Sequence, residues 1–467
     1  MPQEPIHPDE ALRLVLEAAP PPELETVALS EALGRALPRA VLSAIDHPPF
    51  DKSAMDGFAY SRAASGTGAA AAGCACCGGG SVASGASAAG EGQAAGVGAD
   101  AAGRAFRVVE LVAAGAAPTR ALGPGECARI MTGAPLPSGA DSVQRIEWTE
   151  PAGKDASGAD LVRFAKPESV SNVIRRGENL KAGGELLGPR LLAPQDLGIL
   201  ASGGVAELQV ARRPLVGVVS TGDELAAPGA PLGPASIYDS NGPQLAAQAR
   251  AAGCEARFYD AFPDEPGALA AVLGRALAEC DVVLVSGGVS MGDFDYVPRS
   301  LEALGVRRVF HNLAMRPGKP TYFGTLGAKA AFGLPGNPVS TFVNFEVLVR
   351  PHLERRMGLE YRPRVVRARL AAPLSRRGSD RVEFLPARLE RAPLGSGAAD
   401  AAGAGGRESA SGRESAREGA CELARPLGYH GSSMLNVLAE ADALLRMEIG
   451  VDRIEEGGLV DARLLRP

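Results

Sequence analysis

Between Arg212 and about Gly358, apolar strand patterns alternate with helical patterns, and this alternation constrains the fold more than any other feature. Strands that are apolar throughout and separated by helices indicate a parallel sheet covered on both faces. The predicted elements are strands at 215–219, 255–259 and 282–285 and helices at 244–252 and 265–279. We therefore predict an α/β domain over residues 212–360, whose ligands bind at the carboxyl ends of its parallel strands.

The rest of the chain predicts a multi-domain protein of the class α/β plus β. Short apolar runs at 106–112, 127–131 and 161–164 predict a β-rich lobe over 46–179, and runs at 365–370 and 443–448 predict a C-terminal β domain over 361–467. Residues 1–45 and 180–211 are expected to form a small N-terminal linking domain. Within it, we expect Asp9 to cap a helix and residues 29–37 to form another helix.

Two segments of biased composition interrupt these domains, at 63–103 and 391–420. Both are expected to be flexible insertions, because small and polar side chains cannot offset the entropy of ordering. Cys74, Cys76 and Cys77 lie in the first insertion and are candidates for a soft-metal or redox site. No further cysteine or histidine follows at ligand spacing, so compositional drift is the favoured interpretation.

Composition excludes several functional classes. The 467 residues include 48 Lys+Arg and 54 Asp+Glu, a net charge of −6, and aromatic residues are only 4%, which argues against nucleic acid as a partner. No apolar run is long enough to span a membrane, and no secretory signal is expected. Seven scattered cysteines suit a reducing compartment, so a cytoplasmic location is expected.

Polar, glycine-containing loops follow two of the predicted strands. Ser220, Thr221 and Gly222 can present hydroxyl and N–H groups to an anion, and Asp223 and Glu224 follow directly. Carboxylates beside a bound phosphate require a bridging cation, usually Mg²⁺, which makes Glu224 a candidate ligand. The alternative for this loop alone is an acidic helix N-terminus stabilised by the helix dipole.

The second loop, residues 286–290, repeats this pattern and is followed by Asp293 and Asp295. Asp264 opens the intervening helix, where capping alone would also explain it. Three acidic loops in one parallel sheet predict a site that binds a phosphorylated ligand through a metal ion.

A third loop holds two cations close together. Arg316 and Lys319 lie between prolines, and like charges held together are unfavourable unless an anion binds between them. Ser340 lies in the first turn of a helix expected near Val339, where free N–H groups can bind an oxyanion. Two solvated surface cations remain the alternative.

Six strings of residues, in this order, resemble the molybdopterin molybdenumtransferase family, which includes MoeA, the gephyrin E domain and the plant cofactor-synthesis E domain. They are 52–59 (KSAMDGFA), 129–135 (RIMTGAP), 220–225 (STGDEL), 237–241 (IYDSN), 286–290 (SGGVS) and 334–340 (LPGNPVS). The resemblance covers essentially the whole chain apart from the two insertions. It implies a four-subdomain fold and an elongated homodimer, with the active site between the α/β domain of one subunit and the β-rich lobe of the other.

The resemblance also implies a reaction. The substrates would be adenylylated molybdopterin and molybdate, and Mg²⁺ would assist cleavage of the pyrophosphate and release of AMP. The family resemblance leaves open whether a separate molybdopterin adenylyltransferase docks on the chain.

Site residues follow from matching positions. The resemblance implies catalytic roles for Asp56, Thr132, Glu224, Asp264, Asp295 and Lys319, of which Glu224, Asp264 and Asp295 would hold the metal. It implies a molybdate pocket of Arg316, Lys319, Pro320, Ser340, Arg381 and Ser432, with Ser433 as an alternative to Ser432. The pterin substrate is assigned to the strand-end loops: Ser220, Thr221, Gly222, Asp223, Asp239, Asn241, Ser286, Gly287, Gly288, Ser290, Pro335, Gly336, Asn337 and Pro338.

Three positions depart from the family pattern. Arg316 replaces the usual Lys, Asn179 stands where many members carry Asp, and Phe58 replaces a common Tyr. Two other functions remain as alternatives. One is a gephyrin-like scaffold or peptide-binding module without transferase activity. The other is the adenylylation step itself, because residues 212–358 also resemble the adenylyltransferase domain of the same pathway.

Overall fold

The computed structural model describes residues 4–62, 103–166, 168–262, 266–289, 296–376, 378–391, 422–428, 431 and 433–465. The chain forms two compact units. Unit 1 comprises Met1–Arg39, Gly188–Gly198 and Ala206–Pro467, and unit 2 comprises Ala40–Leu187 and Ile199–Val205. The predicted insertions, with the cysteines at 74–77, lie almost entirely outside the described residues. No helix in the described ranges is long and apolar enough to cross a membrane.

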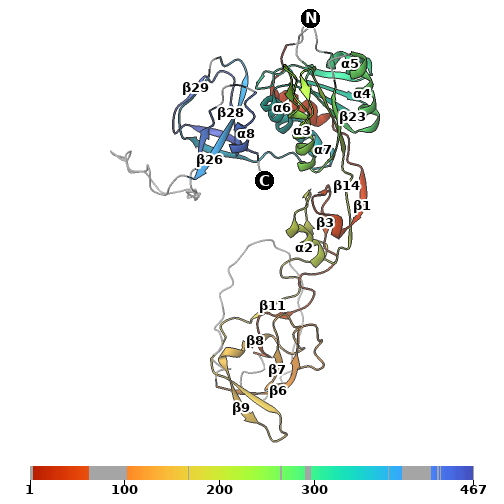
Figure 1. Ribbon diagram of the computed structural model, residues 1–467. Coiled ribbons are helices and arrows are strands. Elements are labelled where there is room, and N and C mark those ends of the chain that lie inside the picture. The colour runs from red at the N-terminus through yellow and green to blue at the C-terminus, as the bar shows by residue number, and fades with distance from the viewer. Residues whose placement is uncertain are drawn as a thin grey trace, which may run out of the picture. The chain divides into compact units, whose positions relative to one another are not determined.

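The α/β domain of unit 1 is built on a six-stranded sheet of order β18-β15-β19-β23-β22-β20 (Figure 1). The first four strands are parallel, as predicted. Strand β22 runs antiparallel to both of its neighbours, β23 and β20, so the sheet is mixed. The strands are β15 (Leu215–Thr221), β18 (Glu255–Phe262), β19 (Val282–Ser286), β20 (Arg307–His311), β22 (Tyr322–Leu326) and β23 (Lys329–Leu334). The strands predicted in this segment are confirmed.

Helices cover both faces of this sheet, which explains why its strands are continuously apolar. Val282 and Leu284 face one core with α3, α6 and α7, whereas Val283 and Val285 face another with α4 and α5. The helical segments are α3 (Asn241–Ala251), α4 (Pro266–Glu279), α5 (Val297–Ala303), α6 (Pro338–Asn344), a π-helical turn (Phe345–Val349) and α7 (Arg350–Arg356). The predicted helices at 244–252 and 265–279 are therefore confirmed.

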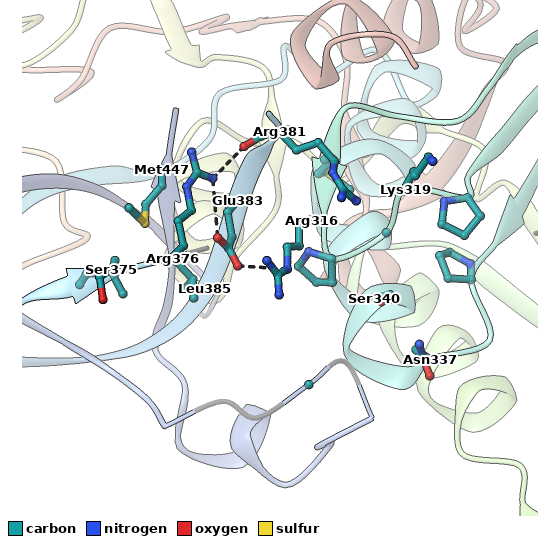
Figure 2. A pocket seen from close by; sticks show the side chains of 17 residues that line it. Arg316, Lys319, Asn337, Ser340, Ser375, Arg376, Arg381, Glu383, Leu385 and Met447 are labelled. Carbon is teal, nitrogen blue, oxygen red and sulfur yellow. Dashed lines mark hydrogen bonds and ion pairs between the residues drawn. The ribbon is translucent and has the colours of Figure 1, made fainter. Parts of the chain in front are cut away.

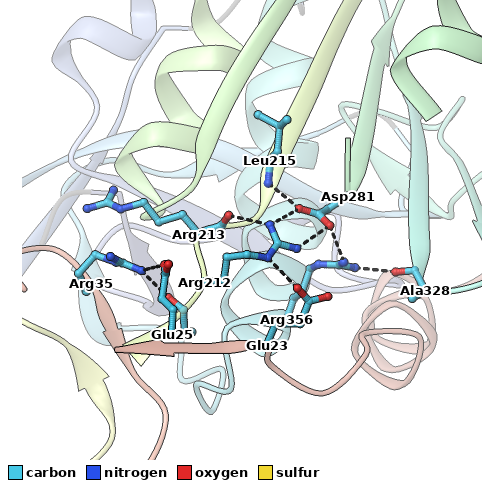
Figure 3. A network of polar contacts seen from close by, with 10 residues as sticks. Glu23, Glu25, Arg35, Arg212, Arg213, Leu215, Asp281, Ala328 and Arg356 are labelled. Carbon is cyan, nitrogen blue, oxygen red and sulfur yellow. Dashed lines mark hydrogen bonds and ion pairs between the residues drawn. The ribbon is translucent and has the colours of Figure 1, made fainter. Parts of the chain in front are cut away.

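A partly buried carboxylate, that of Asp281, links the amino ends of two central strands (Figure 3). Asp281, just before β19, accepts hydrogen bonds from Arg212 at 2.9 and 3.0 Å and from the N–H of Leu215, which begins β15, at 2.7 Å. Arg356 of α7 donates to the same carboxylate at 3.1 Å. This network lies at the end of the sheet opposite the polar loops, so it stabilises the scaffold on which those loops stand.

The N-terminal segment departs from two predictions. Helix α1 (Pro8–Glu17) is capped by His7, whose Nδ1 accepts from the N–H of Asp9, so Asp9 lies in the first turn and is not the cap. Residues 29–37 do not form one helix. They form a 3₁₀ turn (Leu29–Glu31) and the short strand β2 (Ala36–Leu37), which pairs with β13 (Arg190–Leu191). Backbone pairing with a distant segment therefore overrides local helix propensity.

The C-terminal part of unit 1 is a β-barrel, because β26 pairs with both β27 and β28 and closes the sheet. Its strands are β21 (Met315–Arg316), β24 (Val365–Leu370), β26 (Val382–Arg391), β27 (Glu422–Pro426), β28 (Ala443–Met447) and β30 (Leu459–Leu464). Strand β21 comes from the α/β domain and pairs in parallel with the start of β26. This short ladder fixes the cationic loop of the α/β domain to the barrel.

Unit 2 contains a six-stranded sheet of order β8-β5-β7-β6-β10-β9. The strands are β5 (Gly57–Tyr60), β6 (Ala105–Val112), β7 (Glu126–Ile130), β8 (Ser142–Arg145), β9 (Thr149–Lys154) and β10 (Asp160–Phe164). Tyr60, Phe106 and Phe164 form an aromatic cluster at its core, with ring centroids 4.4–5.6 Å apart. The β-rich character predicted for this region is confirmed.

Short elements complete both units. Unit 1 also holds β1 (Leu24–Ala28), β14 (Glu207–Ala211), β16 (Leu225–Ala226), β17 (Ile237–Tyr238), β25 (Leu374–Ser375), β29 (Arg453–Ile454) and α8 (Val437–Glu440). Unit 2 holds β3 (Val41–Leu42), β4 (Lys52–Ser53), β11 (Val173–Ile174), β12 (Glu185–Leu187) and a 3₁₀ turn (Ile146–Trp148), and α2 (Pro194–Ser202) contributes to both.

Candidate functional site

A cavity of about 530 Å³, the strand-end cavity, opens at the carboxyl ends of β15, β19 and β23. Its position follows from the parallel sheet, whose loops converge where the strands end. The cavity is lined by eleven of the residues assigned to the substrate or the metal: Thr221, Glu224, Asp239, Asn241, Ser286, Gly287, Gly288, Pro335, Gly336, Asn337 and Pro338. Ser220, Gly222 and Asp223 lie in the same loop without lining it, and Ser290 is outside the described residues.

Asn241 ties the loops of this cavity together. Its amide nitrogen donates to Oγ of Ser286 at 2.7 Å and to the carbonyl of Gly336 at 2.7 Å. These partners end β19 and follow β23, and Asn241 itself begins α3. One buried side chain therefore sets the spacing of three loops.

The glycine after β19 is required by close packing. Gly287 has φ +96°, and a Cβ atom there would lie 2.3 Å from the carbonyl oxygen of Thr221. Any other residue would force the β15 and β19 loops apart, because real atoms do not approach so closely. The two loops can therefore face one ligand only with glycine here.

Three buried oxygen atoms at these loops have no hydrogen-bond partner among the described residues: Oγ of Ser220, Oδ2 of Asp239 and Oδ1 of Asn241. Buried polar atoms are normally paired, so an unpartnered group calls for an explanation such as a bound ligand. The Glu224 carboxylate is exposed and borders the same cavity. A donor set made only of oxygen atoms fits Mg²⁺, which prefers oxygen ligands.

The other predicted metal ligands, Asp264 and Asp295, lie outside the described residues. Within the described ranges, no group of three or more His, Cys, Asp or Glu side chains is placed to hold a metal ion. Glu224 is therefore the one predicted ligand whose surroundings are seen.

A second cavity of about 630 Å³, the cation cavity, lies between the α/β domain and the barrel of unit 1 (Figure 2). It brings together the five described residues that were expected to hold an oxyanion: Arg316, Lys319, Pro320, Ser340 and Arg381. The sixth, Ser432, is outside the described residues, and the alternative Ser433 lines the strand-end cavity instead.

The loop that carries Arg316 and Lys319 packs closely against α6. Gly318 has φ +105°, and a Cβ atom there would lie 2.0 Å from Nδ2 of Asn344. Asn344 donates to the carbonyl of Ser340 at 2.9 Å and accepts from Oγ1 of Thr321 at 2.8 Å. These contacts join the Arg316–Lys319 loop to α6, which supplies Ser340. The Lys319 ammonium is exposed and has no ion-pair partner in the described part of the chain.

Two further charged residues of this cavity were not predicted. Glu383 and Arg376 have side chains only 6% and 5% exposed. The Glu383 carboxylate lies 3.5 Å from Nε of Arg316 and 3.6 Å from Nη1 of Arg376. Both residues stand in a charge-rich stretch whose pattern resembles a solvated surface, so the sequence offers little signal for them.

The two cavities adjoin, because Pro320, Pro335 and Asn337 line both. One cavity presents glycine-rich loops and unpartnered oxygen atoms, and the other presents cations. A ligand in the strand-end cavity and an anion in the cation cavity would therefore be held next to each other.

Unit 2 contains the remaining pair of predicted site residues. The Asp56 carboxylate accepts two hydrogen bonds from Thr132, one from the backbone N–H at 2.6 Å and one from the hydroxyl at 2.7 Å. These bonds lower the pKa of Asp56 below its usual value, with the backbone N–H contributing most. Asp56 is therefore an exposed, ionised carboxylate in a fixed orientation.

Comparison with known families gives three matches in chain order. Residues 6–204 match the MoeA N-terminal region (domain I and II), residues 217–355 match the probable molybdopterin binding domain, and residues 409–465 match the MoeA C-terminal region (domain IV).

Curated relatives and solved structures agree with these matches. A molybdopterin molybdenumtransferase of Staphylococcus aureus is 32% identical over 79% of this chain and 80% of its own length. Molybdopterin molybdenumtransferase 2 of Mycobacterium tuberculosis is 35% identical over 75% of this chain and 81% of its own length. The crystal structure of a molybdopterin biosynthesis MoeA protein from Pyrococcus horikoshii superposes with a TM-score of 0.72 at 29% identity, covering 99% of this chain and 100% of that one.

Proposed function

The chain belongs to the family of molybdopterin molybdenumtransferases, enzymes of molybdenum cofactor biosynthesis, and on this basis we propose how it acts. It inserts molybdate into adenylylated molybdopterin, and the pyrophosphate bond of that substrate is cleaved with release of AMP. The observation that carries this proposal is the pair of adjoining cavities, which share Pro320, Pro335 and Asn337. This reaction requires an oxyanion and a phosphorylated substrate to lie next to each other. The cation cavity suits the oxyanion, and the strand-end cavity suits the phosphorylated substrate.

The cation cavity would bind molybdate. Lys319 has no ion-pair partner among the described side chains, and Arg316 and Arg381 border the same space. Charge-assisted hydrogen bonds from such cations are the strong interactions available to a tetrahedral dianion. Ser340, in the first turn of α6, and Ser432 would add hydroxyl donors, and Pro320 would limit the width of the cavity.

The strand-end cavity would bind the pterin and its pyrophosphate. Gly287 and Gly288 allow the backbone to approach the phosphate groups closely, and Ser286, Thr221 and Asn241 supply polar groups. Unpartnered oxygen atoms on Asp239 and Asn241 suit N–H donors, which a pterin ring carries.

Glu224, Asp264 and Asp295 would hold Mg²⁺ in this enzyme. The bound cation would neutralise charge on the pyrophosphate. Asp56 and Thr132 would act from the β-rich lobe of a second subunit, in a homodimer.

The four domains outlined from the sequence remain part of this proposal, as do a cytoplasmic location and an adenylyltransferase partner. Three buried cysteines, Cys127, Cys254 and Cys280, are free thiols, which supports a reducing compartment.

Product analysis tests the proposed function. The protein is incubated with adenylylated molybdopterin, molybdate and Mg²⁺, and the product is used to reconstitute a molybdenum enzyme that lacks its cofactor. Reconstituted activity is expected with the wild type and not with Glu224→Ala. Binding of substrate without conversion would favour the scaffold alternative. ATP-dependent adenylylation of molybdopterin would favour the adenylyltransferase alternative.

A further inference from the structure

Glu383 is a buried carboxylate in a cavity that otherwise carries positive charge. A carboxylate beside a site for a dianion weakens anion binding by repulsion unless its own charge is offset or it serves another purpose. Its side chain is 6% exposed, and it faces Arg316 on one side and Arg376 on the other (Figure 2). The arrangement therefore requires an explanation.

Arg376 offsets the charge of Glu383 and does not serve as an anion ligand. Its guanidinium donates to the carbonyls of Val451 and Arg381 at 2.7 Å each and to the carbonyl of Glu448. Its side chain is 5% exposed, so its donors are committed to the protein. The Arg376–Glu383 pair is thus neutral, fixed and buried in the wall of the cavity.

Arg316 is the exposed partner in this arrangement. Its side chain is 53% exposed, yet its backbone is fixed opposite Glu383, because Arg316 and Glu383 are paired residues of β21 and β26. The contact at 3.5 Å is made by Nε of the guanidinium, and Arg316 also lines the cation cavity.

We propose that Glu383 is a positioning residue that holds the guanidinium of Arg316 in the orientation that binds the oxyanion. This inference rests on the proposed function and explains why an arginine can serve at position 316. A guanidinium has five donors and can be held on one edge while it binds an anion on another. An ammonium is a single point charge and must divide itself between Glu383 and the anion.

The test compares molybdate binding among variants by isothermal titration calorimetry with sodium molybdate. Glu383→Asp keeps the negative charge but withdraws the carboxylate from Arg316 by one carbon–carbon bond. We expect it to weaken molybdate binding by about fivefold or more, the size of a typical coupling between contacting groups. Arg316→Lys is expected to weaken binding similarly, and the double variant should be no weaker than Arg316→Lys alone.

The matched control is Glu390→Asp, which shortens another carboxylate on β26 that pairs with Arg425 at the surface. It should leave molybdate binding and the melting temperature unchanged. In steady-state assays of AMP release, Glu383→Asp should raise KM for molybdate while kcat stays near the wild-type value. A purely structural role would instead lower the melting temperature and the amount of active enzyme.

Failure of the two proposals can be told apart. Wild-type protein that binds no molybdate would overturn the assignment of the cation cavity and this inference with it. Wild-type protein that binds molybdate, with Glu383→Asp and Arg316→Lys unchanged, would overturn this inference alone. If Glu383→Asp does not fold, the test rests on molybdate binding by Arg316→Lys. The Arg316 side chain is half-exposed, so its replacement is expected to leave the fold intact.

Discussion

Thr132 donates both its backbone N–H and its hydroxyl to the same oxygen of Asp56, at 2.6 and 2.7 Å. The two residues stand 76 positions apart in the chain, and the antiparallel pairing of β5 with β7 brings their loops together. Two bonds on one oxygen fix the carboxylate and favour its ionised form. The resemblance to the family implied roles for both residues, and their contact suggests that they act as a unit.

Thr132→Val should raise the pKa of Asp56, because the valine cannot donate the side-chain hydrogen bond. A group whose folded pKa is lowered loses its charge only at low pH, so the variant should lose activity at a higher pH than the wild type. The acid limb of the pH profile of AMP release measures this shift. Thr132→Ser keeps the hydroxyl and serves as the control. An acid limb that is identical in all three proteins would contradict a role for this bond.

Glu224→Gln should abolish Mg²⁺-dependent AMP release and leave the fold intact, because the side chain is exposed at the strand-end cavity. Activity as a function of Mg²⁺ concentration, together with the melting temperature, checks both parts. Glu360→Gln removes a carboxylate that pairs with Arg362 on the surface of the same unit and should change neither quantity. Wild-type turnover by Glu224→Gln would exclude this carboxylate from the metal site.

Asp281→Asn should destabilise unit 1 by about 3 kcal/mol, because it leaves the partly buried Arg212 and Arg356 without a countercharge. Trp148, the one tryptophan of the chain, lies in unit 2, so its fluorescence does not report on this change. Hydrogen exchange of the β15 and β19 amides measures it directly. Asp461→Asn breaks an exposed pair with Arg367 and should cost no more than about 0.5 kcal/mol. Equal effects of the two substitutions would contradict the stabilising role of Asp281.

His352 should make the stability of unit 1 depend on pH. The ring is fully buried, and desolvation lowers the pKa to about 4, although a hydrogen bond to the carbonyl of Val15 opposes this effect. The unfolded chain binds a proton near pH 6.5 and the folded chain does not, so stability falls as pH drops from 6.5 towards 4. The loss amounts to about 3 kcal/mol over this interval.

The variant His352→Phe cannot titrate, and its stability should change less over the same interval. Hydrogen exchange of α1 and α7 at pH 4.5, 5.5 and 6.5 compares it with the wild type. The aromatic neighbours Phe323 and Phe332 can accommodate a second ring type at this position. Parallel pH dependences in the two proteins would exclude His352 as the source.

The α/β core could be predicted from the sequence because its strands are apolar on both faces. Residues 215–219 and 282–285 admit no amphipathic alternative, and Gly253 ends the intervening helix segment. The 29–37 segment could not be predicted in the same way. Its local pattern suits a helix, but Ala36 and Leu37 pair with Arg190 and Leu191, which are far away in the chain.

The residues of the candidate site were also predictable from the sequence only in part. Arg316 and Lys319 were found because prolines hold two cations together within one loop. Glu383 was missed because alternation along a strand places a glutamate between Val382 and Phe384 on the solvent side. In the structure Val382, Glu383 and Phe384 are all buried, because the start of β26 is covered on both faces. A cavity that forms between the α/β domain and the barrel does not produce a recognisable pattern in the sequence of either domain.

An oxyanion bound in the cation cavity would be used in the cleavage of a substrate bound in the adjoining strand-end cavity. AMP release from adenylylated molybdopterin, measured in the presence of Mg²⁺ with and without molybdate, tests this coupling. Release is expected to depend on molybdate in the wild type, and Lys319→Ala is expected to raise the molybdate concentration needed. Release that is equally fast without molybdate, or that Lys319→Ala leaves unchanged, would contradict it.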